Sequence, residues 1–186
     1  MPVWQQFYTH YQLANTEVVA VAIDVQGAAK AQPFVELAKA TYPNVVDSEN
    51  VLSQYFGFKA LPNAVFVDEA GVIRYTHFGG FDIRKPEHRQ IAEHFATSPN
   101  LTVLAAATKD GQAFDNTEVL AHFQTGLAHY QAGEIQAALI EWRKGLALDP
   151  ANWIIRKQIW AIENPARFYA GEIDAIWQKE QIAQNR

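Results

Sequence analysis

The feature that most constrains the fold is an almost unbroken apolar run, VVAVAIDV, at Val18–Val25. The run is rich in β-branched residues, and its one charged residue, Asp24, stands near its end. A strand with this composition is typical of a sheet that is buried on both faces beneath helices. The run therefore predicts an α/β domain, and Asp24 is expected to cap the turn that follows the strand.

The segments around this strand alternate between helical and extended patterns. Apolar residues at helical spacing predict a helix from Pro2 to Leu13. Two short extended runs joined by Asp68-Glu-Ala-Gly71 predict an antiparallel hairpin, because glycine tolerates the positive φ of such a turn. The sequence therefore predicts a mixed sheet covered on both faces, with these further elements: helix 28–41, short strand 45–46, helix 49–56 capped by Asp47 or Ser48 and ended by Gly57, hairpin strands 63–68 and 72–78, and a helix from 83 or 86 to 96.

A proline stands directly before the first strand of the hairpin, in the stretch FGFKALPNAVFV. Proline has no backbone N–H to donate to a neighbouring strand, so it does not fit inside a central strand. Pro62 is therefore expected to end a loop. From the residues alone, the default interpretation of Pro62 is an ordinary turn proline with a trans peptide bond, placed before an edge strand.

The chain of 186 residues contains no cysteine. It can therefore form no disulfide, no thiolate nucleophile and no cysteine-ligated metal site. None of its six histidines belongs to an HExxH pair, and no glycine-rich phosphate loop is present. We expect no catalytic residue, metal site or cofactor within these residues.

The formal net charge is −5, and the chain has no run of lysine and arginine. This charge argues against a nucleic-acid-binding surface. No stretch approaches the length of a membrane-spanning helix, and the first residues do not resemble a signal peptide. The chain as written is expected to be cytoplasmic; a signal segment upstream of it would make the protein extracytoplasmic.

The stretch AHFQTGLAHYQAGEIQAALIEWRKGLALDPAN, in the second half of the chain, resembles a single tetratricopeptide repeat. The resemblance rests on small and aromatic residues at the offsets of a repeat of about 34 residues. It implies two antiparallel helices that approach closely at Gly126 and Ala138, with Gly133 ending the first helix. A lone repeat must bury its apolar face against another part of the protein or a dimer mate, or it forms a peptide-binding groove.

The residues after this repeat contain many aromatic side chains and a helix-breaking Pro165. We expect this tail to dock through its aromatic residues onto the repeat or the sheet, although an interaction surface is an alternative. The predicted organisation is a partial α/β domain at 1–97, a linker at 98–116, a tetratricopeptide-like hairpin with the start of the next helix at 117–163, and a docked tail at 164–186.

Residues 1–96 resemble the thioredoxin-like fold, in particular the redoxins related to TlpA/ResA-like disulfide reductases and alkyl-hydroperoxide/thiol-specific antioxidant proteins. The resemblance lies in EVVAVAID, in YFGFKALPNAVFVDEAGVIRYTHFGG and in the initial MPVW. It implies a thioredoxin-like mixed sheet whose first strand is missing. It also implies a cis peptide bond before Pro62 and a substrate-binding loop formed by Leu61, Pro62 and Asn63.

In this family the chemistry depends on a Cys-x-x-Cys motif at the start of the first helix, where the helix N-terminus lowers the thiol pKa. The corresponding position would lie ahead of Met1. Three explanations remain open: the natural protein begins earlier; the upstream motif contains a residue such as selenocysteine; or the chain is a redox-inactive variant that keeps the fold as a binding module.

Two functions follow from these expectations. The first is a thiol–disulfide oxidoreductase or antioxidant redoxin whose catalytic thiols lie outside this chain, so that the chain alone is inactive. The second is a non-catalytic binding or scaffold module. The partners implied are protein thiols or disulfides, or a peptide, at the loop around Pro62, and a protein partner or a second copy at the tetratricopeptide-like hairpin.

Overall fold

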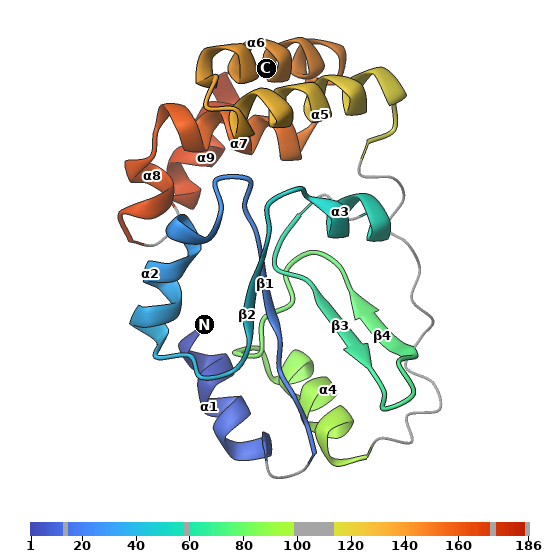
Figure 1. Cartoon of the computed structure of the whole chain (residues 1–186). Coiled ribbons are helices and arrows are strands. Elements are labelled where there is room, and N and C mark those ends of the chain that lie inside the picture. Colours follow the sequence, from blue (N-terminus) through green and yellow to red (C-terminus); the bar gives the residue numbers. More distant parts are fainter. Residues whose placement is uncertain (13–14, 58–59, 99–113, 172–173, 185–186) are drawn as a thin grey trace. The chain divides into compact units, whose positions relative to one another are not determined.

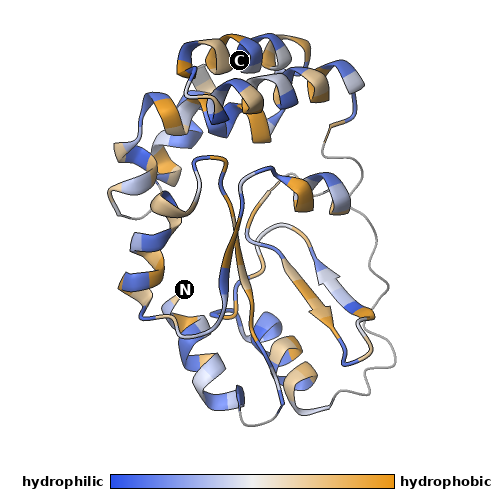
Figure 2. Ribbon diagram, viewed as in Figure 1, coloured by the Kyte–Doolittle hydropathy of each residue, from blue (hydrophilic) through white to orange (hydrophobic). Residues whose placement is uncertain are grey.

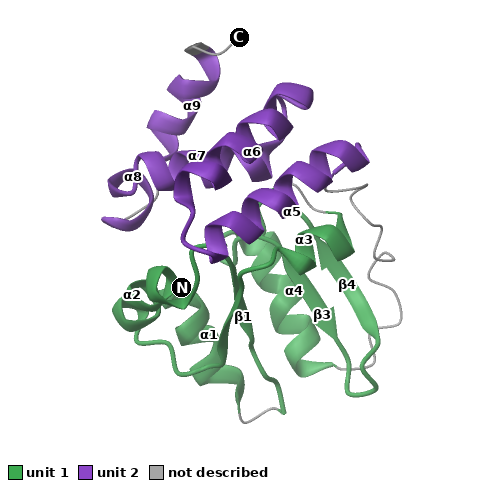
Figure 3. Cartoon of the chain, turned by 45° about the horizontal axis from the view of Figure 1, so that its top comes forward, with its two compact units in different colours: residues 1–113 green, residues 114–186 purple. Residues whose placement is uncertain are grey.

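The computed structural model describes residues 1–12, 15–57, 60–98, 114–171 and 174–184. The chain divides into two compact units, Met1–Ala113 and Phe114–Arg186 (Figure 3). The predicted linker 98–116 spans this division, and its strand-like stretch 101–107 lies outside the described residues. Each unit is described by itself below.

Unit 1 is an α/β unit, as the sequence predicts (Figure 1). The parallel pairing of its first two strands requires a helical crossover between them, and the antiparallel pairing of the last two requires only a short turn. In chain order the elements are α1 (Pro2–Tyr11), β1 (Ala20–Ile23), α2 (Ala28–Ala38), β2 (Asn44–Asp47), α3 (Val51–Phe56), β3 (Ala64–Val67), β4 (Ile73–His77) and α4 (Pro86–Thr97).

The strands of unit 1 form two separate two-stranded sheets instead of the single mixed sheet that the sequence predicts. β1 and β2 are parallel, with Ala20 opposite Asn44 and Ile23 opposite Asp47. β3 and β4 are antiparallel, with a register shift between Phe66 and Val67. Figure 2 shows β3 as an apolar strand beside a more polar β4.

The prediction that the Val18–Val25 run is a strand buried on both faces is wrong. The strand covers only Ala20–Ile23, none of its residues is fully buried, and Val21 is 38% exposed. The physical reason is the sheet topology. Within the described residues β1 pairs with β2 alone, so no strand lies along its second edge.

Local capping signals in the sequence are confirmed. Asp47 caps α3, because its two carboxylate oxygens accept hydrogen bonds from Val51 N at 2.9 Å and Leu52 N at 2.8 Å. Gly57 ends the same helix with φ of 76°. Asp24 caps its turn by accepting a hydrogen bond from Gln26 N at 2.9 Å.

The core of unit 1 lies between helices α1 and α4, the hairpin and the loop that follows it. Its buried members are Phe7 of α1, Phe81 and Ile83 of the loop, and Ala92 and Ala96 of α4. Partly buried residues that pack against this cluster include Val18, two residues before β1, Ala64 and Phe66 of β3, and Tyr75 of β4. The β3–β4 hairpin therefore packs on this cluster through residues of both of its strands.

Unit 2 is entirely helical where it is described, with α5 (Thr117–Gln131), α6 (Ile135–Leu148), α7 (Trp153–Glu163), α8 (Ala166–Tyr169) and α9 (Ala175–Gln184). α5 and α6 form a helical hairpin. Gly133, with φ of 81°, lies in the turn between them, as the sequence predicts. Gly126 lets the two helices approach, because a Cβ there would lie 2.4 Å from Trp142 Nε1.

The aromatic residues of the C-terminal segment pack within unit 2. Phe168 of α8 and Trp177 of α9 belong to one apolar cluster with Trp160 of α7. The rings of Trp160 and Trp177 lie 5.3 Å apart in an edge-to-face arrangement. This segment therefore forms an apolar cluster with α7. Among the described helices, none combines the length and the apolar character that a membrane span needs.

Candidate functional site

The predicted substrate-binding loop, Leu61–Pro62–Asn63, leads directly into β3. The Leu61–Pro62 peptide bond is cis, as the resemblance implies. The Pro62 carbonyl accepts a hydrogen bond from Phe81 N at 3.1 Å, and Asn63 Oδ1 accepts one from Gly79 N at 2.6 Å. These two bonds fix the loop to the segment that follows β4, while the Leu61 side chain stays 48% exposed.

Phe81 ties this loop to the core of unit 1. It is 2% exposed and stacks on His88 of α4 with ring centroids 4.7 Å apart. It also meets Phe66 of β3 at 5.8 Å in an edge-to-face contact. Since Phe81 N also donates to Pro62, one buried aromatic residue positions the loop relative to both the hairpin and α4.

Only one of the two polar atoms in the Asn63 side-chain amide has a hydrogen-bond partner among the described residues. Its oxygen is bonded to Gly79 N, whereas its nitrogen, Nδ2, is buried and has no hydrogen-bond partner among the described residues. A buried polar group without a partner costs on the order of 1–3 kcal/mol. Such a group beside an exposed apolar side chain is a candidate donor for a ligand carbonyl.

Two further unpaired amides lie at the same end of unit 1. Gln26 follows the end of β1 by three residues, and Asn50 follows the end of β2 by three residues. Gln26 Nε2 and both polar side-chain atoms of Asn50 are buried without partners in the described part of the chain. Figure 1 shows that β3 begins at the end where β1 and β2 finish. The carboxyl ends of parallel strands are a common place for ligand sites.

Neither of these amides was identified from the sequence. Gln26 and Asn50 stand in loops where polar residues are ordinary, and nothing in their spacing indicates burial. Asn50 adopts a left-handed conformation with φ of 58°, which asparagine tolerates, and it is 1% exposed. Only the tertiary structure reveals that its amide is buried.

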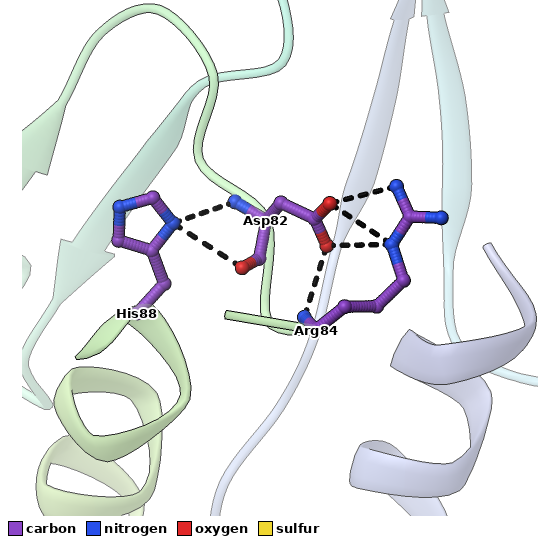
Figure 4. A network of polar contacts seen from close by, with 3 residues as sticks. All are labelled: Asp82, Arg84 and His88. Carbon is purple, nitrogen blue, oxygen red and sulfur yellow. Dashed lines mark hydrogen bonds and ion pairs between the residues drawn. The ribbon is translucent and has the colours of Figure 1, made fainter. Parts of the chain in front are cut away.

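A polar network beside the loop joins Asp82, Arg84 and His88 (Figure 4). His88 Nδ1 accepts a hydrogen bond from Asp82 N at 2.9 Å, so the imidazole faces the backbone of Asp82 and not its carboxylate. The Asp82 carboxylate instead pairs with Arg84, whose Nε lies 2.9 Å from both carboxylate oxygens. The network is therefore no relay from a carboxylate through an imidazole to a nucleophile.

Charge pairing controls the ionisation of Asp82. Hydrogen bonds from the Arg84 side chain and backbone lower the pKa of the Asp82 carboxyl to about 2 from its ordinary value of 3.8. The carboxylate remains charged at every physiological pH. Its role is to hold the turn between the hairpin and α4.

Two histidine contacts join different elements of the fold. His77 of β4 and His88 of α4 have ring centroids 4.7 Å apart, a pairing that the sequence did not indicate. In unit 2, His122 Nδ1 of α5 lies 2.8 Å from Glu141 Oε2 of α6. In the part of the chain that the structure describes, no group of three or more histidine, aspartate or glutamate side chains is arranged to hold a metal ion.

Comparison of the chain with models of known protein families, with curated proteins and with solved structures finds no match.

Proposed function

We propose that unit 1 is a thioredoxin-like module that binds an extended polypeptide at the Leu61–Pro62–Asn63 loop, without thiol chemistry of its own. The observation that carries this proposal is the half-satisfied amide of Asn63. Its oxygen is bonded to Gly79 N, and its buried nitrogen has no partner among the described residues. An extended main chain offers the carbonyl acceptor that this nitrogen lacks.

Leu61 supports the same assignment. Its exposed side chain precedes the anchored residues of the loop, so it offers apolar contact beside a fixed polar donor. Binding sites commonly combine an apolar surface with a few well-placed polar groups. The proposal includes no thiol–disulfide exchange by these residues, because that reaction needs a thiolate nucleophile and the chain has no cysteine.

The test is binding of an unfolded polypeptide to the full chain. The probe is fluorescein-labelled α-lactalbumin, reduced and carboxymethylated so that it stays unfolded, and binding is followed by fluorescence anisotropy. Asn63→Asp keeps an oxygen for Gly79 N and loses the donor, so we expect binding to weaken about tenfold through the loss of one buried hydrogen bond. Leu61→Ala should weaken binding severalfold.

Matched variants control for the chemistry of each change. Gln6→Glu adds one negative charge on an exposed position of α1, and Leu37→Ala truncates a leucine on α2 that is 81% exposed. Both should bind the probe as the wild type does. Unchanged binding by Asn63→Asp and Leu61→Ala together would rule out the loop as the recognition site.

A reductase assay separates recognition from catalysis. The full chain should not accelerate the reduction of insulin by dithiothreitol, since it has no cysteine. Acceleration above the uncatalysed rate would contradict the proposal that these residues act by binding alone.

A further inference from the structure

His88 is a buried histidine in the first turn of α4, and it contacts the segment that anchors the candidate loop. The residue is 7% exposed and follows the first residue of the helix, Pro86, by two positions. Its Nδ1 accepts a hydrogen bond from Asp82 N at 2.9 Å, and its ring stacks on Phe81 with the two planes inclined by 14°. His88 therefore holds Phe81 both through its ring and through the peptide group that follows Phe81.

The segment 79–82 carries this contact to the candidate loop. Phe81 N donates a hydrogen bond to Pro62 O at 3.1 Å. Two residues earlier, Gly79 N donates to Asn63 Oδ1 at 2.6 Å. The segment is thus bonded to the loop on one side and to α4 on the other. A change in its contact with α4 therefore acts on the segment that anchors the loop.

The hydrogen bond from Asp82 N requires a neutral His88. A protonated imidazole carries a hydrogen on both ring nitrogens and can accept no hydrogen bond. Asp82 O lies 3.2 Å from the same Nδ1 atom. A protonated His88 would donate to this carbonyl and release Asp82 N. The two protonation states of His88 therefore select different backbone partners on one residue.

His88 has no carboxylate partner in the described part of the chain. His122 and His129 lie 2.8 and 2.6 Å from glutamate oxygens, whereas neither His88 nor His77 forms such a pair among the described residues. The ring that faces His88 is that of His77, at 4.7 Å between centroids, and the Nδ1 atom of His77 lies 3.2 Å from the Tyr75 hydroxyl. A proton on His88 would thus lie beside a second titratable ring and not beside a negative charge.

The charged groups of the adjoining elements do not change this balance. Figure 4 shows the Asp82 carboxylate turned away from His88 and toward Arg84, which pairs with it. The first turn of α4 carries a positive partial charge from its N–H groups, which disfavours a further cation. The other titratable or charged groups of these elements are exposed or interact elsewhere: His10 of α1, the Met1 amino group with Asp82 and Arg84, Arg74 of β4 with Asp68, Arg89 with Glu93, and Lys85, Glu87 and His94. A charged His88 would therefore gain one backbone carbonyl and no carboxylate.

We propose that His88 is a positioning residue for the Leu61–Pro62–Asn63 loop, and that it anchors the loop only while its imidazole is neutral. Histidine is the side chain that ordinarily changes its charge between pH 5 and 8. Mild acid then releases Asp82 N, loosens the segment 79–82 and weakens recognition of an extended polypeptide. The binding readout of this proposal rests on the proposed function, whereas the exchange of the Phe81 amide needs no ligand.

The first test is the pH profile of binding by the full chain. The probe is reduced and carboxymethylated α-lactalbumin labelled with tetramethylrhodamine, a dye that does not titrate in this range. We expect binding to weaken at least about fivefold from pH 7.5 to pH 5.5. His88→Asn keeps an acceptor near the place of Nδ1 and cannot be protonated, so its binding should change by less than about twofold. His94→Asn, at an exposed position of the same helix, should keep the wild-type profile.

The second test follows the Phe81 amide of the full chain by nuclear magnetic resonance without ligand. Its protection factor, corrected for the intrinsic exchange rate at each pH, should fall at least about fivefold from pH 7.5 to pH 5.5 in the wild type and in His94→Asn. It should stay constant in His88→Asn. His88→Phe keeps the ring and loses the acceptor, so its Phe81 amide should be poorly protected at both pH values. The wild-type measurement needs no variant and remains decisive if a variant fails to fold.

Two results would overturn the proposal. One is a Phe81 protection factor that does not change between pH 7.5 and pH 5.5 in the wild type. The other is a pH profile of binding in His88→Asn that matches the wild type. If the probe bound at neither pH, the proposed function of the loop would be wrong, and the Phe81 amide would still test the role of His88 by itself.

Discussion

The two units differ in how completely they bury their own apolar residues. In unit 2, Phe123, Ala138 and Trp142 are each 0% exposed, and they come from two helices joined by a short turn. In unit 1, one valine of β1, one of β2 and two of β3 remain between 37% and 49% exposed, although the sequence around them is typical of a sheet interior: Val21, Val45, Val65 and Val67. Helical hairpins complete their packing from segments close in sequence. A strand in the interior of a sheet depends on partners at both of its edges, and these partners come from segments distant in sequence.

The core of unit 2 depends on Trp142. Its ring is buried, it donates from Nε1 to Phe123 O at 3.1 Å, and it fills the space over Gly126. Trp142→Ala should therefore cost about 3–5 kcal/mol of unfolding free energy, measured by urea denaturation of the full chain. The control is Ile140→Ala on the same helix, where the side chain is 52% exposed and the effect should stay within about 0.5 kcal/mol. Equal losses for both variants would contradict this account of the hairpin.

Gly126→Ala tests the close approach of α5 and α6 with a smaller expected effect. The added Cβ would lie 2.4 Å from Trp142 Nε1, so we expect a loss of about 1–3 kcal/mol. The double variant with Trp142→Ala removes the clashing ring atoms. In it the Gly126→Ala change should cost less than in the wild type, as a thermodynamic cycle of urea midpoints would show. If the free-energy changes of the two substitutions were strictly additive, the close approach of Gly126 to Trp142 would not be the reason for the glycine.

Hydrogen exchange compares the two units within one molecule. Amides at the open edge of β1, such as Val21 and Ile23, should exchange at least about tenfold faster than amides in the middle of α5 and α6, because unpaired N–H groups are protected by no ladder. Mass spectrometry of the full chain after timed labelling measures both at once. If the β1 amides exchanged as slowly as those of α5 in the chain alone, the expected difference in amide protection between the two units would be wrong.

The smallest effect concerns the turn before α4 in unit 1. Because the folded pKa of Asp82 is lowered to about 2, the stability that its carboxylate contributes is present above the ordinary pKa of 3.8 and is lost as the pH falls toward 2. Asp82→Asn should be slightly less stable than the wild type at pH 6, and the difference should vanish near pH 2. Urea midpoints at pH 6, 4 and 2.5 measure it; a difference that is constant with pH would contradict the pairing with Arg84.

Local features were predictable from the sequence because they depend on residues close along the chain. Asp47 and Gly57 bound α3, Asp24 caps its turn, and Gly133 lies between α5 and α6, each for a reason that one or two neighbouring residues supply. The candidate loop was expected from the family resemblance around Pro62 and not from the local pattern alone. Its anchors were not, since Gly79 and Phe81 contact it across the hairpin.

The unpaired amides could not be predicted in the same way. Burial of Gln26 and Asn50 depends on how the ends of two parallel strands meet, and their register is set by pairing between segments about two dozen residues apart. The contact of His77 with His88 likewise depends on the packing of α4 against β4. None of these proximities leaves a periodic signal in the sequence.

The sequence by itself determined the α/β character of the first unit and the helical hairpin of the second, because composition and short-range periodicity set them. The tertiary structure alone decided that the Val18–Val25 run forms only a short, half-exposed strand. The apolar pattern specifies what the strand prefers to contact. Whether a partner lies along its second edge depends on chain segments distant in sequence or outside the chain, and within the described residues that edge has no strand beside it.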